Sequence, residues 1–300
     1  MKKRHVSKRQ MKKNIAGYLF ILPFIISFFV FTLYPFCRSL YLSFTDYDIL
    51  TPAKWIGLDN YIKMFTEDKK ILQSLMVTFK FAIVQVPLKL AFSLFVAVIL
   101  AWTTRLTGIY RAIFYVPSLL GGGVAVALTW KKLWQVDGVI NSILAGFGIE
   151  GLNWLHDTRT ALYVLVLLGV WQFGSQMIIF LAAIKDVPKE LNEAATVDGC
   201  GTVKRFFKIT LPMMTPALFF NLVNGIIGAL QAFNSAYLIT SGGPMGSTRY
   251  YGLYQYTQAF EYHHMGYASA MAWVMMLIIL TLTALVFRSS SSWVYYQNEE

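Results

Sequence analysis

The sequence predicts an all-α integral membrane protein with six helices that cross the bilayer, and three observations lead to that prediction. Hydrophobic residues make up 56% of the 300 residues, and the mean hydropathy is +0.53. Charged residues make up 14%, against about 25% in a typical soluble domain. Long stretches carry no charge, and two cysteines are too few for a disulfide scaffold. The composition therefore excludes both a soluble globular domain and a disordered chain.

Six segments are long and apolar enough to cross a bilayer, which takes about 20 residues of helix. The first is too long for the apolar core of a cleaved signal peptide, so we expect it to remain as an anchor. The second carries two lysines, Lys80 and Lys89. We predict spans at about 15–37, 75–102, 109–130, 160–184, 212–236 and 265–287.

The basic amino-terminal segment 1–14 indicates the orientation, because seven of its residues are Lys or Arg. Cytoplasmic segments of membrane proteins carry an excess of these two residues. With this end inside, the inner segments hold 15 of the 26 Lys and Arg, although the outer segments are longer. Both termini, including the tail 288–300, are therefore predicted to be cytoplasmic.

The segment 185–212, between the fourth and fifth spans, predicts a short hairpin of two helices. Apolar residues at i, i+3 and i+4 spacing, starting at Leu191, share one helix face. Gly199 can end this helix in a left-handed turn, and Thr202 can cap the next one. Two interpretations remain at this point. The hairpin is either an amphipathic loop on the membrane surface or a docking element for a soluble partner that would push on both spans.

The same segment resembles the EAA loop of ABC importer permeases. That pattern is E-A-A-x-x-D-G followed by F-x-x-I-x-L-P, and its matches here are Glu193, Ala194, Ala195, Asp198, Gly199, Phe206, Ile209, Leu211 and Pro212. One departure is Cys200, where the family usually has alanine. Other stretches resemble the carbohydrate branch of the family, and they are 18–36, 55–65, 111–130, 238–248 and 266–270.

The resemblance implies the type I ABC importer permease fold, similar to the larger partner of the maltose-type permease pair. It implies half of a translocation path in a bacterial inner membrane, completed by a second six-span permease in a heterodimer. Two separate ATPase subunits would bind ATP and Mg, and an extracytoplasmic solute-binding protein would deliver the sugar. The residues implied in ATPase coupling are Glu193, Ala194, Ala195, Asp198, Gly199, Leu211 and Pro212. Glu193 would contact the ATPase, Gly199 would make the turn, and the alanines would allow close approach.

Sequence patterns for catalysis, metal binding or cofactors are absent from the chain. It has no G-x-x-x-x-G-K-[ST], no G-x-S-x-G and no H-E-x-x-H. His263 and His264 are expected to be solvated in an outer loop. We therefore expect neither an enzyme nor a nucleic-acid partner. One alternative function stays open, which is an integral-membrane scaffold or receptor whose cytoplasmic hairpin docks another partner.

Amides in the fourth and fifth spans predict the substrate path. Such side chains are costly in lipid, so they either line a cavity or bond neighbouring helices, and similarity to the maltose-type permease favours the cavity. The candidates are Gln172, Phe173, Gln176, Asn224, Gln231 and Asn234, with Asn221 on the same expected helical stripe. Lys89 has no evident carboxylate partner. Because it is the one cation available to a cavity, the sequence favours a neutral oligosaccharide.

Overall fold

The structure is a computed structural model that describes residues 8–102 and 107–295. The all-α prediction is confirmed, with one small two-stranded ribbon added. The chain divides into two units, residues 1–64 with 258–274 and residues 65–257 with 275–300. Parts of the predicted terminal segments, 1–7 and 296–300, lie outside the described residues.

The first unit combines a long amino-terminal helix with a small aromatic cluster. Asn60 donates hydrogen bonds to the backbone carbonyls of Ser43 and Thr45, each at 2.9 Å, and joins the ribbon to the helix that follows it. Trp273 donates to the hydroxyl of Ser39 at 3.2 Å. The elements of this unit are α1 (Lys8–Phe28), the π-helical turn η1 (Phe29–Leu33), α2 (Tyr34–Ser43), β1 (Thr45–Asp46), β2 (Lys54–Trp55), most of α3 (Asp59–Thr66), part of η4 (Thr257–Glu261) and the first turns of α15 (Met265–Ser290).

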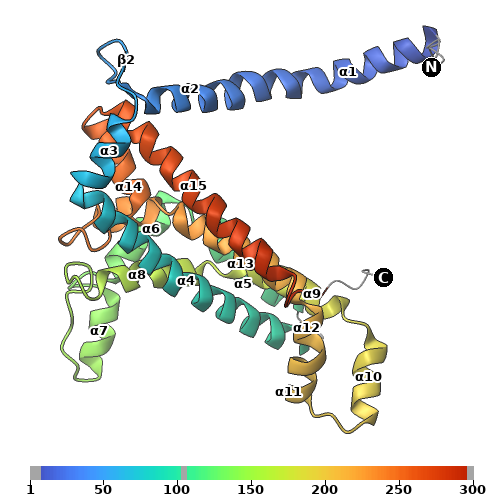
Figure 1. The fold of residues 1–300 in the computed structure, drawn as a ribbon. Coiled ribbons are helices and arrows are strands. Elements are labelled where there is room, and N and C mark those ends of the chain that lie inside the picture. The colour runs from blue at the N-terminus through green and yellow to red at the C-terminus, as the bar shows by residue number, and fades with distance from the viewer. Residues whose placement is uncertain (1–7, 103–106, 296–300) are drawn as a thin grey trace. The chain divides into compact units, whose positions relative to one another are not determined.

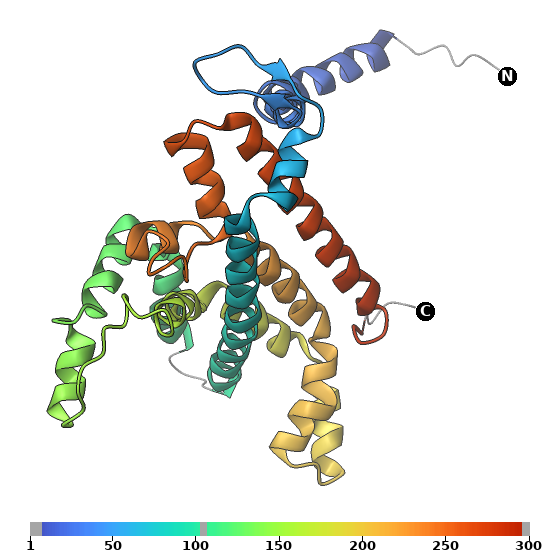
Figure 2. The ribbon, with the colours of Figure 1, turned by 60° about the vertical axis from the view of Figure 1, so that its left-hand side comes forward.

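The second unit is built around the 34-residue helix α4 (Lys69–Trp102), drawn in teal in Figures 1 and 2. It packs against α5 (Thr107–Leu120), α8 (Ala161–Trp171), α9 (Gly174–Asp186), α13 (Thr215–Leu230) and α14 (Tyr251–Tyr256). The remaining elements are α6 (Val124–Leu133), α7 (Val139–Gly146), α10 (Lys189–Val197), α11 (Thr202–Arg205), η2 (Phe206–Thr210), α12 (Leu211–Met213), η3 (Ala236–Thr240) and the later turns of α15.

Small and hydroxyl-bearing residues allow neighbouring helices to approach α4 closely, as is typical of helices in membranes. Ser74, Thr78, Ser93 and Ala97 are fully buried. The hydroxyl of Thr78 accepts the backbone N–H of Tyr251 at 2.8 Å, which ties the start of α14 to α4. The polar residues of this helix therefore serve packing as well as hydrogen bonding.

Three helices of the described chain are long and apolar enough to cross a membrane, and there are up to six if each bent pair is one span. The pairs are α5 with α6, bent by 98°, α8 with α9, bent by 45°, and residues 202–213 with α13, bent by 68°. Each long helix and each pair overlaps one predicted span. The six-span count remains a prediction, because only length and composition support it here.

The fifth predicted span, 212–236, does not form one continuous helix. Helix α13 ends at Leu230, and Gln231 is its C-cap. A turn and the π-helical turn η3 follow. The helical stripe expected to run from Asn221 to Asn234 is therefore wrong in its second half, since uncharged composition alone does not reveal where a buried helix stops.

Gly174 provides a test of the packing between α5 and α9. A Cβ at this position would lie 2.8 Å from Cα of Tyr115 and would clash with the carbonyl oxygen of Phe114. We expect Gly174→Ala to destabilise the detergent-solubilised protein by about 1–3 kcal/mol because it overpacks two backbones, as measured by thermal unfolding. Gly108→Ala in α5 is the control, since nothing lies within 4 Å of its Cβ position. Equal effects of the two substitutions would contradict this account.

Candidate functional site

The hairpin between α9 and α13 turns at a glycine with positive φ. Gly199 has φ +72°, in the left-handed region that glycine adopts without strain. The N–H of Cys200 donates to the carbonyl of Ala195 at 2.8 Å, and that of Gly199 donates to Thr196 at 3.1 Å. These two bonds form a Schellman motif, which closes the end of α10.

A side-chain hydrogen bond joins the two halves of the hairpin. Arg205 of α11 donates to the hydroxyl of Thr196 in α10 at 2.6 Å. That hydroxyl donates in turn to the carbonyl of Asn192 at 2.8 Å. The expected cap at Thr202 is wrong: Gly201 is the N-cap of α11, and its extended backbone has no side-chain cap.

The hairpin exposes both charge and apolar surface. Figures 1 and 2 show α10 and α11 projecting from the other helices of their unit. Among the predicted coupling residues, Glu193, Ala194, Asp198 and Gly199 are exposed, Ala195 is buried, Leu211 is partly buried and Pro212 is exposed. Large apolar side chains beside them are also exposed, and they are Leu191, Val197, Val203 and Phe207. Exposed apolar side chains that lie together mark a surface for contact with a protein or a membrane, so both interpretations of the hairpin remain.

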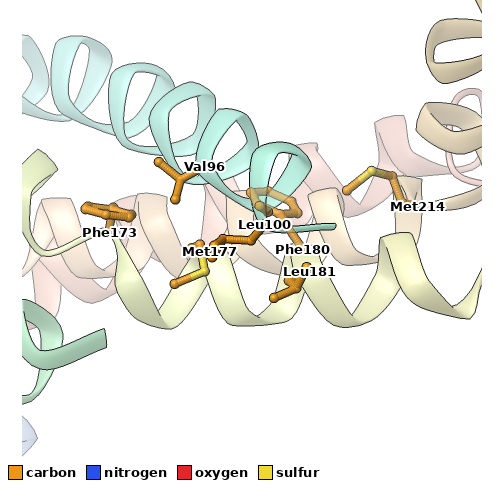
Figure 3. Packing of buried hydrophobic residues seen from close by; sticks show 8 residues of the cluster. Val96, Leu100, Phe173, Met177, Phe180, Leu181 and Met214 are labelled. Atoms are coloured by element: carbon orange, nitrogen blue, oxygen red, sulfur yellow. The ribbon is translucent and has the colours of Figure 1, made fainter. Parts of the chain in front are cut away.

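A hydrophobic cluster anchors the base of the hairpin. It joins Val96 and Leu100 of α4 to Met177 and Phe180 of α9 and to Met214, which precedes α13 (Figure 3). Phe206 and Leu211 from the returning arm pack against it. Both ends of the hairpin are therefore held by one core, and a displacement of the hairpin would act on α9 and α13 together.

The second unit also contains a cavity of about 470 Å³. This volume lies in the range of small-molecule sites, about 300–1,000 Å³. The cavity wall combines aliphatic side chains and glycine backbone with six side-chain amides. The amides belong to Gln85, Gln172, Gln176, Asn224, Gln231 and Asn234.

Two helix breaks meet at this cavity. The break between α5 and α6 spans Gly121–Gly123, and the break between α8 and α9 lies at Gln172 and Phe173. The side-chain amide of Gln172, at the break between α8 and α9, donates to the carbonyl of Gly121 at 2.7 Å. It therefore gives a partner to a backbone group at the break between α5 and α6. Ser118 accepts the N–H of Ser175 at 3.1 Å and adds a second link. Irregular backbone at membrane depth is tolerated where it borders a cavity or protein.

Five of the six residues predicted for the substrate path line the cavity, and one does not. Gln172, Gln176 and Asn224 reach it from α8–α9 and α13, while Gln231 and Asn234 reach it from the turn after α13. Phe173 is the exception. Phe173 is 5% exposed and belongs to the hydrophobic cluster. Its ring packs edge-on against Phe92 of α4, because the helix break turns it toward that helix.

Sequence reasoning missed Gln85, and it did not separate Asn221 from the residues of the cavity wall. Gln85 lines the cavity from α4, and its signal was an uncharged amide four residues before Lys89 in an apolar helix. Asn221, placed on the same stripe as Asn224, is 1% exposed and lies 3.4 Å from the carbonyl of Gln176. It serves helix packing, which the sequence left as an open alternative.

Comparison with known proteins gives concordant matches over nearly the whole chain. The family model described as "Binding-protein-dependent transport system inner membrane component" matches residues 19–293. The probable ABC transporter permease protein YesP of Bacillus subtilis is 52% identical over 297 residues, covering 98% of this chain and 96% of that protein. The lactose transport system permease protein LacF of Rhizobium radiobacter is 32% identical and covers 94% and 96%.

A solved structure shares the fold. It is that of a bacterial alginate ABC transporter in complex with alginate pentasaccharide-bound periplasmic protein. One chain of it matches with a TM-score of 0.80, covering 94% of this chain and 96% of that one. At 20% sequence identity the likeness bears on the fold alone.

Gly199 and Gly201 offer a matched test of the hairpin turn. Nothing lies within 4 Å of a Cβ at either position, but only Gly199 has positive φ. Gly199→Ala should cost about 1–2 kcal/mol of local stability, because an L residue is strained there. We expect faster hydrogen–deuterium exchange at residues 198–205 in the detergent-solubilised protein, whereas Gly201→Ala should leave exchange unchanged. Similar exchange in both variants would show that the turn does not depend on a left-handed residue.

Proposed function

The chain belongs to the family of binding-protein-dependent transport system inner membrane components, and from this premise we propose how it takes part in import. It forms half of a translocation path for a carbohydrate, and its 185–212 hairpin transmits the action of a separate ATPase. The chain is a permease subunit of an ABC importer and not an enzyme. ATP hydrolysis belongs to partner chains.

The observation that carries the transport path is the amide-lined cavity at two helix breaks. Discontinuous helices beside a polar site are typical of transporters, since the freed backbone groups can face a solute. Gln176 and Asn224 lie in otherwise apolar spans and make part of the cavity wall polar. In a helix bundle that carries no solute, nothing would favour the placement of these amides around an open volume.

A carbohydrate suits this wall better than an apolar solute. Sugar hydroxyls both donate and accept hydrogen bonds, and side-chain amides do the same. The relative LacF is named for lactose transport, which supports the carbohydrate branch suggested by the sequence. We propose Gln172, Gln176, Asn224, Gln231 and Asn234 as the residues of this chain that line the sugar path.

The coupling hairpin connects that path to the cytoplasm. We propose that Glu193, exposed on α10, makes the polar contact with the ATPase, while Ala194 and Ala195 allow close approach. Asp198 and Gly199 form the turn. Leu211 and Pro212 lie at the base of the returning arm, and Leu211 packs against the core that holds α4 and α9.

The assembly that this role requires contains several other chains. We propose a second six-span permease as heterodimer partner, two ATPase subunits that bind ATP and Mg, and an extracytoplasmic solute-binding protein. The subunit would be a multi-pass protein of a bacterial cytoplasmic membrane, with both termini inside. The scaffold or receptor alternative predicts a different complex: neither an ATPase nor a second permease would co-purify with it.

Reversal of the charge at Glu193 tests the coupling contact. In cells that express the whole importer, we expect Glu193→Lys to lower uptake by about tenfold or more, since it replaces an attractive polar contact with a repulsive one. Membrane insertion should be unchanged. Asp186→Lys is the control, because Asp186 is also exposed and carries the same charge but ends α9 outside the motif. Wild-type uptake by the Glu193 variant would refute the coupling role.

Asn224 tests the sugar path. Its amide nitrogen bonds the Phe220 carbonyl of its own helix at 2.8 Å, which leaves the amide oxygen for a solute. Asn224→Ala should reduce uptake by about fivefold, the equivalent of one neutral hydrogen bond of about 1 kcal/mol. The control is Thr281→Ala in α15, because Thr281 bonds the Leu277 carbonyl in the same way at 2.8 Å but does not line the cavity. An equal loss of uptake in both variants would point to a general helix effect.

A further inference from the structure

A single charged residue stands on the cavity wall. Among the described residues that line the cavity, Lys89 is the only one with an ionisable acid or base. It lies on α4 four residues after Gln85, so both side chains are on one helix face. It is partly buried. The wall therefore carries one positive charge and no negative charge.

Lys89 has no carboxylate partner in the part of the chain that the structure describes. A salt bridge elsewhere in the described chain joins Lys132 to Asp137 at 3.9 Å and does not involve Lys89. Lys80, on the same helix, is exposed and lies over the ring of Tyr163, with 5.6 Å between its Nζ and the ring centroid. An uncompensated charge at membrane depth is costly and usually marks a functional pathway. Lys89 thus differs from Lys80 in that it lines the amide-bearing cavity, whereas Lys80 lies over an aromatic ring.

A side-chain amide lies on the same cavity wall. The hydroxyl of Ser93, one turn beyond Lys89 on α4, donates to the carbonyl of Lys89 at 2.6 Å, so its hydrogen is engaged within the helix. The amide of Gln176 lines the cavity and carries N–H donors. An ammonium group and an amide donor on the wall of one cavity suit an acceptor with negative charge.

We propose that the cavity receives an acidic sugar and that Lys89 binds its carboxylate. This inference rests on the proposed carbohydrate path and replaces the neutral sugar favoured by the sequence. That earlier preference depended on the small number of cations in the spans, but one cation is enough when no acidic residue on the described wall cancels it. A carboxylate carries a single negative charge and matches one lysine. A phosphate monoester carries about −1.5 to −2 and would leave excess negative charge in the cavity.

Uptake by the complete importer tests the proposal. The probes are short oligosaccharides that contain one uronic acid, the same oligosaccharides with that carboxyl group reduced to a primary alcohol, and a sugar phosphate. The variants are Lys89→Met, Lys89→Arg and the matched control Lys80→Met, which removes the same charge from the same helix. The binding protein is identical throughout, so its own selectivity cancels from the ratio of variant uptake to wild-type uptake for each probe.

We expect wild-type importer to take up a uronic-acid oligosaccharide and Lys89→Met to reduce this uptake at least about tenfold, equivalent to about 1.4 kcal/mol. Lys89→Arg should retain most of the uptake, and Lys80→Met should match the wild type. For any carboxyl-reduced probe that enters, Lys89→Met should have little effect.

Several results would overturn the proposal, and they are distinct from failure of the proposed function. If the wild type imports only the neutral probes or the sugar phosphate, the substrate class is wrong while sugar import stands. If Lys89→Met loses the partner permease during co-purification, Lys89 pairs with that partner and not with a sugar. If the wild-type importer takes up no glycan of any class, the carbohydrate function itself fails.

Discussion

Backbone groups released inside a membrane need partners, and the arrangement of the second unit depends on this constraint. Two bent helix pairs break close together, and the freed carbonyl of Gly121 is satisfied by the amide of Gln172. Ser118 and Ser175 repeat the arrangement a few residues away. Because each break supplies what the other lacks, the pair can leave a polar cavity between helices without leaving backbone groups exposed to lipid.

The hydrophobic cluster connects the cavity to the hairpin between α9 and α13. Helix α9 begins at the break beside the cavity and ends at the hairpin, and its middle contributes Met177 and Phe180 to the core. Met214 brings the returning arm into that core. A close-packed interior transmits displacement because it has little free volume to absorb it. One rigid helix can therefore couple docking at one end to the shape of the cavity at the other.

Lys80 and Lys89 on α4 look alike in the sequence but have different surroundings in the structure. Lys80 and Lys89 both interrupt an apolar run of this helix, and the sequence does not separate their roles. In the folded chain, Lys80 lies against an aromatic ring, whereas Lys89 borders the cavity. The difference arises from which helix packs beside each turn of α4, and that depends on distant parts of the chain.

The sequence by itself determined the membrane class, the helical fold and the hairpin with its turn at Gly199, because apolar length, helical periodicity and the conformational freedom of glycine are local properties. It also identified most of the amides that line the cavity. Only the tertiary structure decided that α13 stops at Leu230, that Phe173 turns into the core and that Lys89 lines the cavity. Those outcomes depend on contacts between segments far apart in the chain, and a helix break rotates every side chain beyond it.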